Sequence, residues 1–203
     1  MKQSVDIILA SGSPRRKELL SKLGLTFQVI KSDAEEIITK TIPEEIVKEL
    51  SILKGRDVFE IVKKETSERQ RLIVSADTIV AIDGLVLGKP EDEEHALAML
   101  MKLSGRDHSV YTGVTGILID EKGKELDSFS FAEETKVFMY PFSEAEAQAY
   151  IDTKEPMDKA GAYGIQGIGG IFVEKIEGDY NNVVGFPLSA FIRVASKKGL
   201  LKL

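Results

Sequence analysis

Short apolar runs that alternate with helix-like segments constrain the fold of this chain more than any other feature of its sequence. Three of the runs, Val5–Ala10, Thr26–Lys31 and Leu72–Ile82, have the length and composition of buried strands. Pro43–Lys64 instead carries apolar residues at helical spacing, which predicts a helix with one buried stripe. Asp83-Gly84 is a turn dipeptide typical of a β-hairpin. Together these features predict an α/β fold with a mixed, twisted sheet and helices on both faces.

The second half of the chain continues the alternation. A helix is expected from Pro90 to about Leu103, and Ser143 with Glu146 forms a capping box that opens another helix. The other expected elements are strands at Leu85–Leu87, His108–Ile119, Asp127–Phe138 and Ile171–Ile176, and a last helix at Pro187–Lys198. Thr153–Gly170 is rich in glycine without a clear period, which is typical of a loop that carries a site. No linker or repeat interrupts the sequence, so residues 1–203 are expected to form a single domain.

Composition excludes several classes of protein. The 27 Lys and Arg residues against 33 Asp and Glu give a net charge of −6, so there is no overall basic field that would attract a nucleic acid. Cysteine is absent, which excludes disulfides, thiolate catalysis and cysteine-ligated zinc. No apolar run is long enough for a membrane span or a signal peptide. We therefore expect a cytoplasmic protein with neither a membrane nor a nucleic acid as its partner.

Ser11-Gly12-Ser13-Pro14-Arg15-Arg16 joins the first strand to a short helix. Ser13 is a natural N-cap, and Pro14 suits the first helical position. The free N–H groups of such a helix start, with two hydroxyls and two guanidinium groups beside them, favour a phosphate-binding site. A capped helix with solvated arginines explains the same residues equally well when they are taken alone.

Other candidates are spread along the chain. Asp77 lies inside an apolar run, where a metal ion, a cation or an activated water would offset the cost of its burial, although a strand-end cap is a rival explanation. Lys89 places an ammonium at a helix entrance, but a single lysine is more often simply exposed. Gln166, in the glycine-rich loop, offers an amide donor and acceptor that can pair with a base edge. Three residues that are not specific by themselves complete the set: Glu35, Glu36 and Lys54.

The chain resembles the Maf family of nucleoside-triphosphate pyrophosphatases. The resemblance runs from Leu9 to Pro187 and rests on five motifs in a fixed order: Ser11-Gly12-Ser13-Pro14-Arg15-Arg16, Ala76-Asp77-Thr78, Gly88-Lys89-Pro90, Leu103-Ser104-Gly105 and the segment from Glu155 to Gly167. It implies hydrolysis of a nucleoside triphosphate between the α and β phosphates, with a divalent cation, Mg²⁺ or Mn²⁺. It also implies a homodimer and an inosine-triphosphatase-like fold with two lobes around a cleft.

With the resemblance in place, phosphoryl-transfer chemistry implies a role for each candidate. Asp77 would act as the general base, and Glu36, preferred to its neighbour Glu35, would hold the metal together with Asp77. The phosphates would be bound by Ser11, Ser13, Arg15, Arg16, Lys54 and Lys89. The residues that resemble the branch acting on dTTP and UTP are Arg15, Thr78 and Gln166.

Two alternatives stay open. One is the same chemistry on another base, such as 7-methyl-GTP, and the other is a nucleotide-binding regulator of septum formation. Gly55 and Phe186 stand where the family usually has Ala and Leu, and both are interpreted as packing changes. Asp158 and its neighbour Lys159 form either a structural pair or a ligand contact, and neither is counted among the catalytic residues.

Overall fold

Three long strands each contribute residues to both of the two compact units into which the chain divides. The computed structural model describes residues 2–202. Unit 1 comprises Met1–Asp77, Thr112–Glu133 and Gly185–Leu203, and unit 2 comprises Thr78–Tyr111 and Glu134–Val184. The strands that belong to both units are β4 (Arg71–Ile82), β6 (Asp107–Ile119) and β7 (Glu125–Met139). Two units are in keeping with the two lobes that the resemblance implies.

The sheet of residues 2–202 is mixed. Its strand order is β3-β2-β4-β6-β7-β8, with β5 paired to β4. The shorter strands are β2 (Asp6–Leu9), β3 (Phe27–Val29), β5 (Leu85–Leu87) and β8 (Val173–Glu177). β2 runs parallel to β3 and β4, whereas β5 and β8 are antiparallel to β4 and β7. The mixed pairing confirms the α/β fold class that the sequence predicts.

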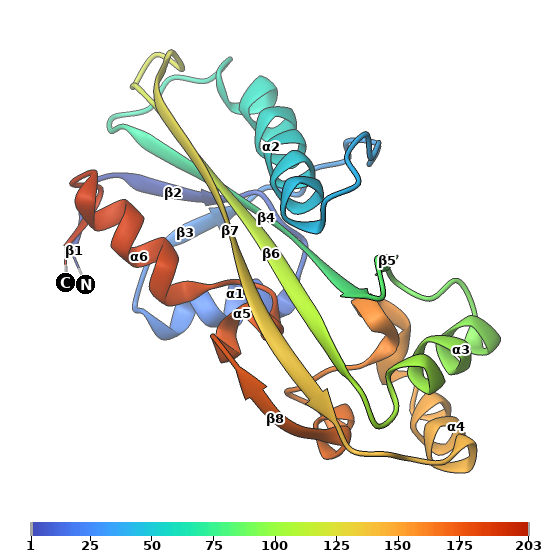
Figure 1. Ribbon diagram of the computed structural model, residues 1–203. Helices are drawn as coiled ribbons and strands as arrows, with labels where there is room; N and C mark the ends of the chain where they lie inside the picture. The colour runs from blue at the N-terminus through green and yellow to red at the C-terminus, as the bar shows by residue number, and fades with distance from the viewer. Residues whose placement is uncertain (1, 203) are drawn as a thin grey trace. The chain divides into compact units, whose positions relative to one another are not determined.

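Unit 1 has helices on both faces of its strands. The helices are α1 (Pro14–Lys22), α2 (Pro43–Val62) and α6 (Leu188–Lys197), and α2 and α6 lie on opposite sides of the strands in Figure 1. The Ser51 hydroxyl of α2 lies 2.8 Å from that of Thr115 in β6. The next residue of β6, Gly116, lies on the opposite face of the strand, under the ring of Phe129. The ammonium of Lys198, at the end of α6, lies 5.7 Å from the centre of that ring.

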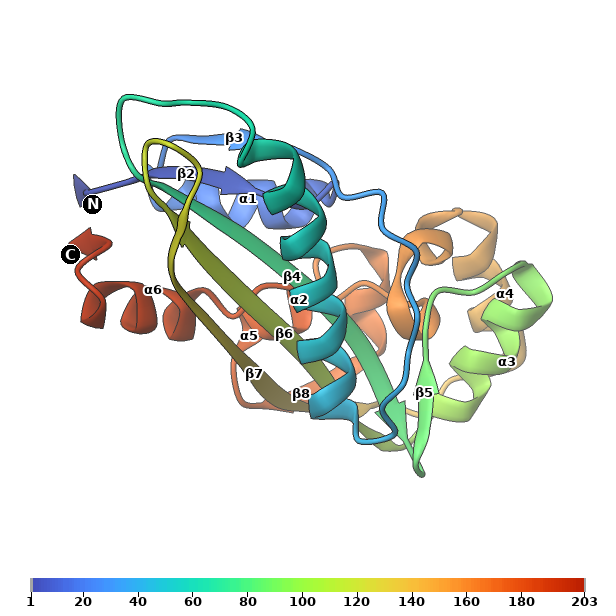
Figure 2. The same ribbon diagram turned by 90° about the horizontal axis from the view of Figure 1, so that it is seen from above.

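The backbone of α2 lies directly on β6, as Figure 2 shows from above. A Cβ at Gly113 would be 2.2 Å from the Val47 carbonyl oxygen, so only glycine allows this approach. The apolar stripe predicted for α2 faces the sheet and closes a core that consists of Ile8, Ala10, Val58, Val62, Ile73, Ile117 and Ile119. This packing fixes the helix that carries Lys54.

Unit 2 packs its helices around a second core. The α-helices are α3 (Glu93–Leu103), α4 (Glu144–Asp152) and α5 (Tyr180–Val184), and the 3₁₀ helices are η1 (Glu155–Asp158), η2 (Ala160–Ala162) and η3 (Ile168–Phe172). The core includes Leu100, Leu103, Val137, Ile151 and Phe172. The capping box of α4 is confirmed, because each of Ser143 and Glu146 accepts a hydrogen bond from the other's backbone N–H.

The start of α3 differs from the sequence prediction. The helix begins at Glu93 and not at Pro90, because the Asp92 carboxylate accepts a hydrogen bond from the His95 N–H at 2.7 Å and caps the first turn. An aspartate cap two residues after a proline defines the first turn better than the proline alone does. The predicted end at Leu103 is confirmed.

A short ribbon joins the two ends of the described chain. Strand β1 (Lys2–Gln3) pairs antiparallel with β9 (Leu201–Lys202), both in unit 1. The pairing sets Lys2 opposite Lys202 and Gln3 opposite Leu201. None of the helices within residues 2–202 combines the length and apolar character that crossing a membrane requires.

Candidate active site

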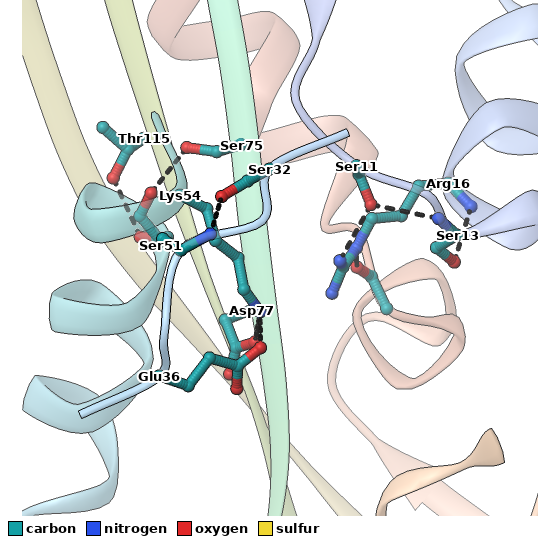
Figure 3. Close-up of polar contacts among 12 residues, drawn as sticks. Ser11, Ser13, Arg16, Ser32, Glu36, Ser51, Lys54, Ser75, Asp77 and Thr115 are labelled. Atoms are coloured by element: carbon teal, nitrogen blue, oxygen red, sulfur yellow. Dashed lines mark hydrogen bonds and ion pairs between the residues drawn. The ribbon is translucent and has the colours of Figure 1, made fainter. Parts of the chain in front are cut away.

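The start of α1 is shaped by hydroxyl and guanidinium groups of unit 1. Ser13 is the N-cap, and its Oγ accepts a hydrogen bond from the Arg16 N–H at 3.5 Å. Ser11 Oγ accepts one from the Ser13 N–H and one from Arg16 Nη1, both at 3.2 Å. Arg16 Nε donates to the Gly185 carbonyl at 2.8 Å. The Arg16 guanidinium is therefore held across the first helical turn, as Figure 3 shows.

Lys54 of α2 pairs with two carboxylates. Its ammonium donates to Asp77 Oδ1 and lies 2.8 Å from Glu36 Oε1. Asp77 sits in the middle of β4 and is only 7% exposed, which confirms that an acidic residue is buried within that strand. The two carboxylates and the ammonium converge in Figure 3. Glu36, preferred over Glu35 from the sequence, is thus the glutamate beside Lys54.

The charges of the carboxylates also act on the Arg16 guanidinium. Burial lowers the pKa of Arg16, Asp77 raises it, Arg15 lowers it by repulsion, and Glu36 raises it again, with a net lowering. Two neighbouring guanidinium groups, one of them partly removed from water, favour an additional anion beside them. Unit 1 therefore brings together most of the residues that the sequence singled out: Ser11, Ser13, Arg15, Arg16, Glu36, Lys54 and Asp77.

The loop between β3 and α2, which carries Glu36, is attached to α2 by two further acidic residues. Asp57 Oδ2 accepts hydrogen bonds from the Ser32 hydroxyl at 2.8 Å and from the Asp33 N–H at 3.0 Å. Glu49 accepts from the Thr39 hydroxyl and from the Thr39 N–H, the latter at 2.9 Å. Neither contact was predictable from the sequence, because acidic residues on an amphipathic helix are usually solvated.

Three predicted residues belong to unit 2. Thr78 is half-buried in β4 directly after Asp77, and Lys89 is exposed. The backbone before Lys89 is attached to the glycine-rich loop, because the Gly161 N–H donates to the Gly88 carbonyl at 3.0 Å. Gln166 is exposed on the same loop. Asp158 and Lys159 form an ion pair at 2.7 Å, in agreement with the structural interpretation.

Glu36 and Asp77 are the oxygen donors that fit a metal ion. Both already contact one cation, the Lys54 ammonium. Within residues 2–202, no group of three or more His, Cys, Asp and Glu side chains is placed to hold a metal. Mg²⁺ is commonly held by one or two carboxylates, with waters and substrate phosphates as its other ligands. The carboxylate pair therefore suits a hard divalent cation that binds together with a triphosphate.

Comparison with known proteins agrees with these features. The family described as Maf-like protein matches residues 6–198. A dTTP/UTP pyrophosphatase of Lachnoclostridium phytofermentans is 46% identical over 96% of this chain and 95% of its own length. A dTTP/UTP pyrophosphatase of Carboxydothermus hydrogenoformans is 48% identical over 92% of this chain and 95% of its own length. A solved dITP/XTP pyrophosphatase of Mycobacterium abscessus aligns over 96% of this chain and 95% of its own, but with 14% identity and a TM-score of only 0.39.

Proposed function

Because this chain belongs to the Maf-like protein family, we propose that it hydrolyses nucleoside triphosphates between the α and β phosphates, with dTTP and UTP as preferred substrates. The products are a nucleoside monophosphate and pyrophosphate. The observation that carries the proposal is the Lys54 ammonium shared by Asp77 and Glu36, whose charges also raise the pKa of the Arg16 guanidinium. Phosphoryl transfer needs cations and an acceptor for the proton of water in one place.

The phosphates are bound by cations and by the start of α1. Arg15 and Arg16 supply guanidinium groups, and the Ser11 and Ser13 hydroxyls lie beside them. The first N–H groups of α1 point out of the helix start and favour a negative charge. Charge-assisted hydrogen bonds of this kind strengthen as negative charge develops on the leaving pyrophosphate, so they lower the barrier.

Asp77 accepts the proton of the attacking water. Its carboxylate is held by Lys54 in a largely buried position, so its direction is fixed. One water is consumed: its oxygen bonds to phosphorus, the P–O bond of the anhydride breaks, and a proton passes to Asp77. General-base catalysis of this type is typically worth about 10²–10⁴-fold in rate.

Mg²⁺ or Mn²⁺ would be held by Glu36 and Asp77. When bound, such an ion neutralises charge on the phosphate oxygens. Lys54 contacts both carboxylates and keeps them close to each other. Asp57 and Glu49 hold the loop that presents Glu36.

Base choice is assigned to Gln166, with Thr78 and Arg15. The Gln166 amide has both a donor and an acceptor, so it matches the N3–H and a carbonyl of thymine or uracil. Cytosine lacks that N–H, and an unmatched buried group costs roughly 1–3 kcal/mol. Lys89 adds a further ammonium for the phosphates.

Pyrophosphate release from a panel of triphosphates tests the proposal. We expect dTTP and UTP to exceed CTP, ATP, GTP and 7-methyl-GTP in kcat/KM with Mg²⁺ or Mn²⁺, and Asp77→Asn to lower kcat by about a hundredfold. Asp83→Asn, which changes a carboxylate paired with Arg106 in unit 2, is the control. A preference for 7-methyl-GTP would overturn the assigned base, and absence of turnover with every triphosphate would favour a nucleotide-binding regulator.

We propose further that residues 1–203 act as one domain of a cytoplasmic protein, and that the protein is a homodimer, as the resemblance implies. Light scattering on the purified protein gives its mass in solution. A mass of one chain would contradict the dimer.

A further inference from the structure

The segment of unit 2 that carries Gln166 is a tight turn. The Gly167 N–H donates to the Gly164 carbonyl at 3.3 Å, which places Gln166 inside the turn, where it is exposed. The Gly170 N–H donates to the Gly167 carbonyl at 3.1 Å and continues the turn into η3. These bonds close the turn but do not attach it to the rest of unit 2.

Glu155 provides that attachment on one side of the turn. Its Oε2 accepts a hydrogen bond from the Ile168 N–H at 2.9 Å, and its Oε1 accepts one from the Gly169 N–H at 3.2 Å. The Tyr150 hydroxyl donates to Oε1 at 2.8 Å and accepts from the Gly164 N–H at 3.1 Å. One carboxylate and one phenol therefore hold the backbone both before and after Gln166.

The glycines of the turn fit closely around this pair. A Cβ at Gly167 would lie 2.4 Å from both Glu155 carboxylate oxygens. A Cβ at Gly169 would lie 2.5 Å from the Tyr150 hydroxyl oxygen. Both positions need glycine because the backbone itself is the partner of the carboxylate and the phenol. The close fit leaves no room for a side chain at either position.

The charge of Glu155 also suits the contacts. Partial burial raises the pKa of Glu155, but the hydrogen bonds from Ile168, Gly169 and Tyr150, and the charge of Lys159, lower it by more. Tyr150 is only 2% exposed, so the phenol that completes the arrangement cannot swing into solvent. The ionised carboxylate is thus the form that the turn accommodates.

We propose that Glu155 is a positioning residue that acts with Tyr150 to fix the Gln166 amide, and thereby determines which nucleobase is accepted. The inference rests on the proposed function, because it assigns base choice to Gln166. Because the Glu155 carboxylate bonds to the loop backbone and to a phenol, its role is to hold the loop and not to act in the cleavage itself.

Glu155→Gln tests this inference. The glutamine NH₂ group would face the N–H of Ile168 or of Gly169, and because both groups are donors, one of the two hydrogen bonds is lost. We expect the ratio of kcat/KM for dTTP to that for CTP to fall by about tenfold, because the Gln166 amide is no longer aligned. Amide hydrogen exchange at Ile168 and Gly169 should accelerate in the same variant. Glu134→Gln, at an exposed glutamate that accepts from Ser109, is the matched control and should change neither quantity.

A dTTP to CTP ratio that stays at the wild-type value, with both substrates slowed equally, would overturn the inference, because that is the effect of a merely structural role. If Glu155→Gln does not fold, Tyr150→Phe removes the shared hydroxyl and keeps the ring, and the same change in ratio is expected. A wild-type protein that releases no pyrophosphate overturns the proposed function and, with it, the role in base choice. The exchange rates then report separately on whether Glu155 holds the turn.

Discussion

Gly55 of α2 lies against Ser75 of β4, so closely that a Cβ on Gly55 would be 2.7 Å from Ser75 Oγ. The Ser75 hydroxyl is buried and donates to the Ser51 carbonyl at 2.6 Å, so it has little freedom to move. The glycine that stands in place of the family's usual alanine is therefore matched to a serine on the facing strand.

Gly55→Ala should lower the free energy of unfolding by about 1–2 kcal/mol. The clash costs about 1–3 kcal/mol, and the better helix propensity of alanine offsets up to about 1 kcal/mol of it. The double variant with Ser75→Ala should recover most of the loss, because it removes the clashing oxygen. Urea unfolding of the wild type, of the two single variants and of the double variant measures the coupling between positions 55 and 75. Effects that simply add would contradict the pairing of these two positions.

Lys54→Ala should reduce both activity and stability. We expect kcat/KM to fall by about a hundredfold, because an ammonium that assists charge development is lost. The free energy of unfolding should fall as well, since largely buried Asp77 then lies near Glu36 without the cation between them. Lys48→Ala is the control on the same helix, because Lys48 pairs with Glu44 at the surface. Normal turnover in the folded Lys54 variant would contradict the assigned site.

Asp57→Asn should increase the Mg²⁺ concentration needed for half-maximal activity by about tenfold, which is typical when a residue behind a metal ligand is changed. One oxygen, Oδ2, accepts from both the Ser32 hydroxyl and the Asp33 N–H, and a neutral amide oxygen accepts these bonds less strongly than a carboxylate oxygen does, so Glu36 is less well placed. Turnover at saturating metal should change little. Glu60→Gln, one turn further along α2 and paired with Lys63, should leave the metal requirement as it is. An unaltered requirement in the Asp57 variant would argue against its role.

His108 should make unfolding pH-dependent. Its Nε2 lies 2.8 Å from the Tyr163 hydroxyl, and burial lowers its pKa from 6.5 to about 4 against the opposing effect of Asp107. Below pH 6.5 the unfolded chain binds a proton that the folded His108 does not, so stability is complete above pH 6.5 and is lost as the pH falls to about 4. The shift corresponds to about 3 kcal/mol.

Urea unfolding at pH 7.5, 6 and 5 measures this loss. His108→Gln, which lacks the titrating ring, should show a shallower dependence than the wild type over this interval. His95→Gln is the control, because His95 lies at the start of α3 and its ring accepts an exposed hydrogen bond from the Glu91 N–H. An equally steep dependence in the His108 variant would exclude His108 as the source.

Local patterns were sufficient for most of the elements. The Ser13 cap, the Asp83-Gly84 hairpin and the capping box of α4 each depend on residues within a few positions of one another, and all three are confirmed. The helix α5 was missed, because five residues are too few to show a helical period. The ribbon of β1 and β9 was missed for another reason: each strand has two residues, and its partner lies at the other end of the sequence.

The site was predictable as a set of residues but not as a set of contacts. Asp77 stood out because a carboxylate in an apolar strand needs a partner, and the structure supplies Lys54. The sequence favoured Glu36 over its neighbour Glu35, but the contact of Glu36 with Lys54 depends on how the loop lies against α2, where Asp57 holds it. Glu155 gave no signal of its role, because its partners are backbone N–H groups 13 and 14 residues away.

The ribbon of β1 and β9 has a consequence for engineering the chain. Lys2 and Lys202 are directly paired, so the two ends of unit 1 emerge side by side. A linker of a few glycines and serines would span neighbouring strands, which lie about 5 Å apart. New termini could then be opened in the exposed β6–β7 turn around Lys122, far along the chain from the residues proposed to bind phosphate. Such a circular permutant would keep every side chain of the candidate site on its own element while changing the order in which the elements are synthesised.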